Sequence, residues 1–419
     1  MPQQRAVDPI SALRHGGFLV FLIGSFVSNS GNQMRSVAVG WEIYDRTGSK
    51  LYLGYVGLVL ALPVLLLALP AGSAADRYSR RGLIMIAQTG LALSGAGLAW
   101  ASANYAPLPV VYLLLLCTGV FRALGWPAAT AIVTGLVPTQ VFPNAAMWRT
   151  VAFQTAATLG PLAGGLLLAW WSPAVVYLVD ASSSIVLVVC MLFVKPRPHQ
   201  RHAEPKSWGS FTQGLRFLRR QPVIISTMTL DMVAVLFGGA VAMLPVYAKD
   251  VLEVGATGLG WMRAMPSIGA ICMGLLLAVR PPLQRGGRAI LVSVVVFGVA
   301  TIVFGVSMWY PLSLAALFVL GAADTISVVV RATVLQLMTP DSLRGRVSAV
   351  SNVFIGTSNE IGDFESGVAA EWMGLVPSVV FGGTMVLVTV GAVARIWPEL
   401  ARLGSFAHLL PPEPVDVVK

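Results

Sequence analysis

Several carboxylates stand inside long apolar stretches of this sequence. One stretch contains Glu360 and Asp363, and Asp231 and Asp324 each lie in another. Glu360 and Asp363 are three residues apart, so they would share one face of a helix. Charged groups in an apolar environment are costly and usually face a partner or a water-filled cavity. Because burial disfavours the charged form of a carboxyl group, we regard these four acids as candidates for proton coupling or substrate contact.

Arginines in similar stretches offer a different interpretation of the same acids. A static ion pair with an arginine would neutralise a buried carboxylate without any further role. Arg331 follows Asp324 by seven residues, about two turns along one helix face, so Arg331 could simply satisfy Asp324. Arg331 is nevertheless kept as a coupling or substrate candidate. The arginines that could form such pairs are Arg35, Arg122, Arg149, Arg263 and Arg331.

The first apolar stretch carries an unusually polar run between Ser28 and Arg35. Side chains this polar at membrane depth must line water or ligand, or be satisfied by neighbouring helices. We favour the lining of an internal cavity. The residues assigned to this cavity are Asn29, Asn32, Gln33 and Arg35.

Apolar blocks long enough to cross a bilayer must position all of these residues. The chain is 56% hydrophobic and 11% charged, whereas a soluble domain would carry about a quarter charged residues. Blocks of roughly 20 apolar residues fit transmembrane helices. The sequence therefore predicts an all-α membrane protein with twelve transmembrane helices, at residues 18–41, 51–74, 83–103, 110–133, 145–170, 174–194, 223–246, 258–279, 289–308, 312–335, 347–370 and 376–396.

Two stretches of the chain match each other at fixed offsets. The matched pairs are Gly119 with Gly321, Pro138 with Pro340, and Gly165 with Gly367. Such internal repeats in a membrane protein indicate a transporter whose binding site lies where the halves meet. We predict two pseudo-symmetric six-helix bundles at 1–194 and 222–397. Between them lies a cytoplasmic linker with an amphipathic helix at 195–221, and a cytoplasmic tail follows at 398–419.

The net charge of +10 is distributed by topology. If the helices alternate in direction, the N-terminus, the central linker and most basic loops fall on one side of the membrane. The opposite side receives only Arg46, Lys50 and Lys249. This asymmetry predicts that both termini are cytoplasmic. It also means that the basic excess does not indicate nucleic-acid binding.

The loop after the second predicted helix holds a compact motif. It consists of Gly72, Asp76, Arg77, Arg80 and Arg81. This spacing resembles the signature of the major facilitator superfamily, with a serine at position 79 in place of the second glycine. The resemblance implies a latch on the cytoplasmic side that opens as the transporter changes state. A plain cluster of positive charge is the alternative, although it would need neither the glycine nor the aspartate.

A second motif lies in the fifth predicted helix and contains Gly160, Pro161, Gly164 and Gly165. It resembles the motif that marks exporters within this superfamily, and a packing seam of small residues is the alternative. Arg122 lies in the fourth predicted helix, near the position at which many exporters of the superfamily carry a buried arginine linked to coupling. We therefore include Arg122 among the coupling candidates.

Within the superfamily, the chain resembles the enterobactin-exporter-like group, which also contains macrolide efflux pumps. The similarity spans most of the chain, and its sharpest motif combines Thr339, Pro340, Arg344, Gly345 and Arg346. It implies a monomeric secondary transporter that exports a siderophore or lipophilic drug across the bacterial inner membrane by proton antiport. An importer or facilitated-diffusion carrier on the same fold is the alternative.

An enzyme is not expected from this sequence. All four histidines lie outside the predicted spans, and neither a metal-ligand spacing nor a nucleophile motif is present. We therefore expect no catalytic residues, no metal and no cofactor. The expected energy source is the proton gradient, and the expected partners are a small-molecule substrate, protons and the lipid bilayer.

Overall fold

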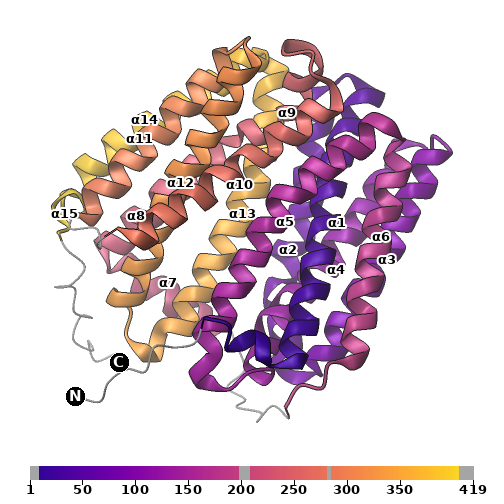
Figure 1. Cartoon of the computed structure of the whole chain (residues 1–419). Helices are drawn as coiled ribbons and strands as arrows, with labels where there is room; N and C mark the ends of the chain where they lie inside the picture. Colours follow the sequence, from indigo (N-terminus) through magenta and orange to yellow (C-terminus); the bar gives the residue numbers. More distant parts are fainter. Residues whose placement is uncertain (1–8, 198–207, 281–284, 405–419) are drawn as a thin grey trace. The chain divides into compact units, whose positions relative to one another are not determined.

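The computed structural model describes residues 9–197, 208–280 and 285–404, and these residues form helices and connecting turns without any strand (Figure 1). Long apolar segments form helices because each backbone N–H and C=O is then paired within its own segment, as a membrane interior requires. In chain order, the elements are η1 (Ala12–Arg14), α1 (Gly16–Thr47), α2 (Lys50–Arg77), α3 (Arg80–Ala103), α4 (Leu108–Ala131), η2 (Ile132–Gly135), η3 (Thr139–Val141), α5 (Phe142–Trp170), α6 (Pro173–Phe193), α7 (Trp208–Arg219), α8 (Pro222–Phe237), η4 (Gly239–Val241), α9 (Leu244–Val246), η5 (Tyr247–Val251), α10 (Gly255–Val279), α11 (Gly286–Val306), α12 (Tyr310–Met338), α13 (Asp341–Met373), α14 (Leu375–Ile396) and α15 (Pro398–Arg402).

The predicted spans coincide with the long helical stretches of the structure. Among the described residues, 10 stretches are long and apolar enough to cross a membrane. The two predicted spans that fall outside this set are α1 and α13. They are the helices that carry the polar run and the acidic stretch, so their low hydropathy follows from the candidate functional residues themselves.

The seventh predicted span is not the continuous helix that the sequence suggested. Helix α8 ends at Phe237, and the chain continues through η4, α9 and the π-helical turn η5 to Val251. Gly238 and Gly239 favour such a break because glycine loses the most conformational freedom in a helix. Gly239 also lies close to α13, where a Cβ on it would be 3.0 Å from the carbonyl oxygen of Gly362.

The first of two compact units contains the described residues up to Glu42 and those from Leu62 through α6. Helix α3 packs against both α4 and α6. One apolar cluster of this unit includes Phe18 and Phe21 of α1 together with Met191 of α6, all of them fully or almost fully buried. The unit is thus held together largely by apolar burial between helices that are distant in sequence.

The second unit contains Ile43–Ala61 and the described residues from α7 onward. Helix α12 packs against α10 and α11, and α11 packs against α14 (Figure 1). The linker helix α7 contributes the buried Leu218 to the core of this unit and packs against α13. The last turn of α1 and the first half of α2 therefore belong to the second unit, although they come early in the sequence.

The two matched prolines occupy the same structural position. Pro138 immediately precedes η3, which leads into α5, and Pro340 immediately precedes α13. Beyond α14, the predicted tail begins with the short helix α15, whose Leu400 is fully buried. The remainder of the tail, 405–419, and linker residues 198–207 lie outside the described part of the chain.

Candidate functional site

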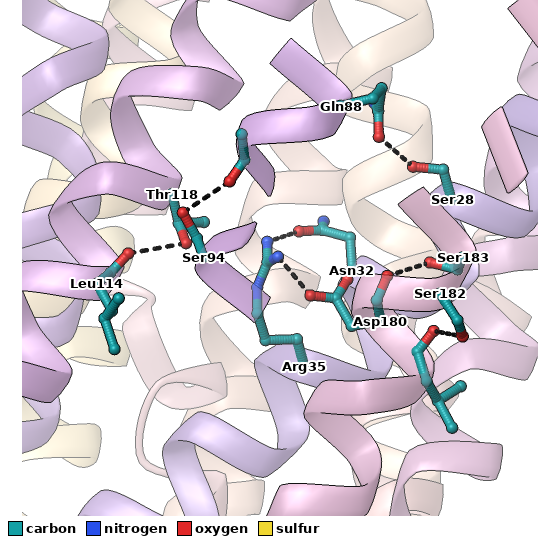
Figure 2. A network of polar contacts seen from close by, with 12 residues as sticks. Ser28, Asn32, Arg35, Gln88, Ser94, Leu114, Thr118, Asp180, Ser182 and Ser183 are labelled. Atoms are coloured by element: carbon teal, nitrogen blue, oxygen red, sulfur yellow. Dashed lines mark hydrogen bonds and ion pairs between the residues drawn. The ribbon is translucent and has the colours of Figure 1, made fainter. Parts of the chain in front are cut away.

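The polar run of α1 forms a buried ion pair with α6 in the first unit (Figure 2). Arg35 donates a hydrogen bond from one guanidinium nitrogen to a carboxylate oxygen of Asp180, at 2.7 Å. The other terminal nitrogen donates to the side-chain oxygen of Asn32. The side chains of Arg35 and Asp180 are 6% and 1% exposed. A pair this deeply buried keeps its charges because each compensates the desolvation of the other.

Two glycines allow the backbones around Asp180 to approach closely. A Cβ on Gly31 of α1 would lie 3.1 Å from Asp180 Cα and nearer still to the Ser183 hydroxyl. A Cβ on Gly95 of α3 would lie 3.1 Å from a carboxylate oxygen of Asp180. The acid is therefore enclosed between α1 and α3, because both helices present glycine at the contact.

The four residues assigned to cavity lining differ in what they contact. Asn32 and Arg35 are satisfied by each other and by Asp180, which is the alternative that the sequence left open. Gln33 packs its Cβ against Gly160 of α5. Asn29 is half-buried and makes no hydrogen bond to the described residues. Cavity lining remains a prediction for Gln33 and Asn29.

The glycine motif of α5 is a close contact with α1. A Cβ on Gly160 would lie 2.6 Å from Gln33 Cβ, and one on Gly164 would lie 3.0 Å from Met34 Cα. Pro161 and Gly165 are buried in the same helix. The packing seam is thus present in the first unit, directly beside the polar run of α1.

The motif between α2 and α3 ties three helices of the first unit together. Arg80 donates to the Ala131 carbonyl at 2.8 Å and to the Thr134 hydroxyl at 3.1 Å, at the end of α4. Arg81 donates to the Leu192 carbonyl near the end of α6, at 3.0 Å. Asp76 and Arg77 are exposed in the last turn of α2, and Gly72 is buried.

The serine that departs from the superfamily signature has a structural role of its own. Ser79 is the N-cap of α3, and its hydroxyl accepts a hydrogen bond from the backbone N–H of Gly82 at 3.3 Å. A serine oxygen satisfies a helix-end donor that glycine would leave to water. Serine at position 79 therefore has less backbone freedom than the glycine of the signature, but it provides an N-cap for α3.

The second unit contains its own buried ion pair, between α8 and α12. Arg331 contacts the carboxylate of Asp231, and their side chains are 8% and 7% exposed. A cavity of about 10 Å³ adjoins the pair, which is about the room that one water molecule needs. Ser351 and Ser358 of α13 also line this cavity. The pair thus faces a small space between three helices that both polar and apolar side chains line.

Asp324 does not pair with Arg331, contrary to the alternative raised by their spacing. Arg331 turns instead to Asp231 of a neighbouring helix. Asp324 is half-buried in α12 and makes neither a hydrogen bond nor an ion pair with the described residues. Seven residues along a helix amount to about 10 Å of axial rise, which is too far for direct contact.

The acidic stretch of α13 lies against the first half of α2 and the break after α8. A Cβ on Gly57 would lie 2.7 Å from Asp363 Cβ and 2.8 Å from the carbonyl oxygen of Glu360. Across the same unit, the charge of Asp363 acts on the guanidinium of Arg263 in α10. Glu360 and Asp363 both lie within the continuous helix α13, so their three-residue spacing places them on one helix face.

Contacts at the end of α1 were missed by sequence reasoning. Tyr44 donates to a carboxylate oxygen of Asp250 in η5, and Lys249 donates to Asp45 at 2.5 Å. In the first unit, Tyr177 donates to Glu42 at 2.7 Å. These partners are more than a hundred residues apart and belong to no motif, so only the packing reveals them.

The remaining candidate, Arg122, is half-buried in α4. Arg149 of α5, one of the arginines available for pairing, makes no hydrogen bond or ion pair with the described residues. Within the described ranges, no group of three or more His, Cys, Asp or Glu side chains could hold a metal ion.

The long helices of the two units have the fold of membrane transporters of the major facilitator type. Solved structures of that type share this fold. The nucleoside transporter NupG, as its D323A mutant, superposes with a TM-score of 0.70 at 15% identity, covering 91% of this chain and 100% of NupG. A bacterial homologue of the human lysosomal transporter Spinster gives 0.71 at 14% identity, covering 95% and 98%. A D-xylose–proton symporter gives 0.70 at 12% identity, covering 93% and 99%.

The family is given by the sequence as a whole. Residues 7–413 match the model of the transmembrane secretion effector family of the major facilitator superfamily, and the chain belongs to that family. It is 25% identical over 389 residues to the enterobactin exporter EntS of Shigella flexneri, which covers 93% of each chain. The Escherichia coli O1:K1 protein of the same name is equally similar. The chain is therefore a multi-pass membrane transporter and not an enzyme.

Proposed function

We propose that this protein exports a small molecule across the bacterial inner membrane by proton antiport. It works by alternating access as a monomer, with the proton gradient as its only energy source and no cofactor. The observation that supports the proton-coupling part is the carboxyl group of Asp324, which lies within a membrane-spanning helix and has no ion-pair or hydrogen-bond partner among the described residues. Intramembrane acids are retained chiefly where they serve a function.

The contrast between Asp324 and the paired acids supports its assignment as the proton carrier. Protonation of Asp180 or Asp231 would leave Arg35 or Arg331 as an uncompensated buried charge. Protonation of Asp324 breaks no ion pair with a described residue. It removes a charge from an apolar setting, so the proton can bind and leave without disrupting the helix packing.

The acidic stretch of α13 supplies the second part of the proposed coupling machinery. Asp363 and Glu360 lie on one face, against the first half of α2, while the neighbouring Gly362 meets the broken end of α8. Discontinuous helices in transporters provide binding sites at membrane depth. We therefore assign Asp363 to coupling or substrate contact, in addition to Asp324. In this scheme, the two buried ion pairs hold the scaffold.

Two observations support export rather than import. The Gly160–Gly165 motif resembles that of exporters and forms the contact of α5 with α1. The similarity to EntS also extends over 93% of the chain. Siderophores and lipophilic drugs are accordingly the substrate classes that we propose. The placement of both termini in the cytoplasm rests on the distribution of basic residues.

The proposal can be tested with purified protein in vesicles that carry an imposed pH gradient. Uptake is measured for a siderophore and for a lipophilic dye. For at least one of these two compounds, uptake should depend on the pH gradient. Asp324→Asn should abolish this dependence, whereas Glu399→Gln, an exposed acid of α15, should leave it unchanged. Transport that persists when the gradient is collapsed would instead support a facilitated-diffusion carrier.

A further inference from the structure

The second unit carries an apolar groove on its surface that the transport cycle proposed above does not use. It lies between α10, α11 and α12 and has a volume of about 680 Å³. Its walls include Val292 and Val319, which are 61% and 39% exposed. Ala322 and Ala323 are buried at the groove. Small residues there leave a hollow that larger side chains would fill.

The groove runs along the helices. On α11 its lining recurs at Ala289, Val292 and Val296, and on α12 at Phe318, Ala322 and Ile326. These stripes extend over eight and nine residues, which corresponds to about 12 Å of helix at 1.5 Å per residue. A narrow apolar trough of this length fits an extended acyl chain lying parallel to the helices.

The positively charged residues that line the groove lie at one of its ends. Arg285 immediately precedes α11 and Arg288 lies in its first turn, and both line the hollow. Both are exposed and form no ion pair with the described residues. The other polar lining residue, Ser293, donates its hydroxyl to the Ile290 carbonyl at 2.9 Å. The two guanidinium groups are therefore the polar groups left to recognise a ligand.

We propose that this groove is a binding site for an anionic phospholipid, with the acyl chain along α11 and α12 and the headgroup phosphate between Arg285 and Arg288. Guanidinium groups bind phosphate through charge-assisted, often bidentate hydrogen bonds. By the orientation predicted from the charge pattern, these arginines lie at the cytoplasmic surface, where anionic headgroups are found. The site depends on the bilayer and not on the direction or substrate of transport.

A second copy of the chain is a less suitable occupant. A protein surface docking here would have to bury the two arginines, and desolvated charges need well-placed partners. In a phospholipid, the apolar acyl chain is joined to a charged phosphate at one end. In the groove, the apolar wall likewise ends at the two arginines, so the two match. Charge complementarity therefore favours the lipid.

The test is lipid retention by purified protein, measured with native mass spectrometry after addition of equal amounts of phosphatidylglycerol and phosphatidylethanolamine. The wild-type protein should retain phosphatidylglycerol in preference, by about 25-fold, since each of the two basic residues near a membrane surface contributes about fivefold. The double variant R285Q/R288Q should retain the two lipids equally. The variant R395Q, at an exposed arginine in the last turn of α14, should keep the wild-type preference.

A second variant separates the groove from general surface charge. Val292→Trp fills the trough from its exposed wall and leaves both arginines in place, so it should also lose the preference for phosphatidylglycerol. Equal retention of both lipids by the wild type would overturn the proposal. A preference that survives in R285Q/R288Q would overturn it too, as would a dimer that Val292→Trp dissociates. Inorganic phosphate at the same concentration should not displace the lipid, because the acyl chain contributes to binding.

Discussion

Arg331 of α12 forms its ion pair with Asp231 of α8, although Asp324 lies on its own helix. This pairing leaves Asp324 as the acid of α12 without a partner among the described residues. One contact therefore separates Asp231, which is held in an ion pair, from Asp324, the acid to which we propose to assign proton transfer.

Breaking the Asp231–Arg331 pair should destabilise the protein strongly. Asp231→Asn or Arg331→Gln leaves one buried charge without compensation, which costs about 3–5 kcal/mol. The double variant D231N/R331Q should recover much of the loss, since neither charge remains. Thermal unfolding in detergent measures the effect, with Lys249→Gln as the control at an exposed pair, where about 0–1 kcal/mol is expected. A loss in the double variant equal to the sum of the two single losses would show that the pair is not coupled.

Asp324→Asn should differ from Asp180→Asn in stability. Asp180 compensates Arg35 at 2.7 Å, so its replacement leaves a buried guanidinium unpaired and lowers stability by about 3–5 kcal/mol. Asp324 has no such partner among the described residues, so Asp324→Asn should change stability by no more than about 0.5 kcal/mol. Melting curves of the two variants in the same detergent make the comparison. A large loss in Asp324→Asn would reveal a structural partner for that acid.

Asp363→Asn should weaken proton-coupled transport while the protein remains folded. The side chain lies against Gly57 and acts electrostatically on Arg263, so the amide keeps the volume and removes the charge. The dependence of transport on an imposed pH gradient measures the effect, and Glu399→Gln serves as the matched acid elsewhere in the second unit. Unchanged coupling would remove Asp363 from the proposed mechanism.

Gly31→Ala should destabilise the first unit. The added Cβ would meet the Ser183 hydroxyl and lie 3.1 Å from Asp180 Cα, and overpacking of this kind typically costs about 1–3 kcal/mol. Gly274→Ala is the matched control, because a Cβ there meets nothing within 4 Å. That control should stabilise α10 by about 0.5–1 kcal/mol, as alanine is the better helix former. Melting temperatures that shift in the same direction for both variants would contradict this prediction.

Ser79 should act as a cap and not as a tolerated replacement of glycine. Ser79→Ala removes the acceptor for the Gly82 N–H and should cost about 1 kcal/mol, whereas Ser79→Gly should cost only a few tenths. The two variants can be compared by thermal unfolding. Equal losses would show that the long 3.3 Å hydrogen bond contributes nothing.

The sequence by itself determined the helical membrane architecture, because runs of about 20 apolar residues have few other structural solutions. It also located the loop motif of Arg80 and Arg81 and the shared face of Glu360 and Asp363, since both depend on local spacing. It placed the seventh span, which the structure retains as a candidate crossing at Pro222–Val251, but not the helix break after Phe237, because hydropathy carries no information on where a helix breaks.

Only the tertiary structure decided which charges compensate one another. Arg35 meets Asp180 across 145 residues, and Arg331 meets Asp231 on another helix instead of Asp324 on its own. Periodicity fixes the face of a helix on which a side chain lies, but not the helix that packs against that face. Helix packing is set by small residues such as Gly31 and Gly95, whose close contacts appear only when the chain is folded.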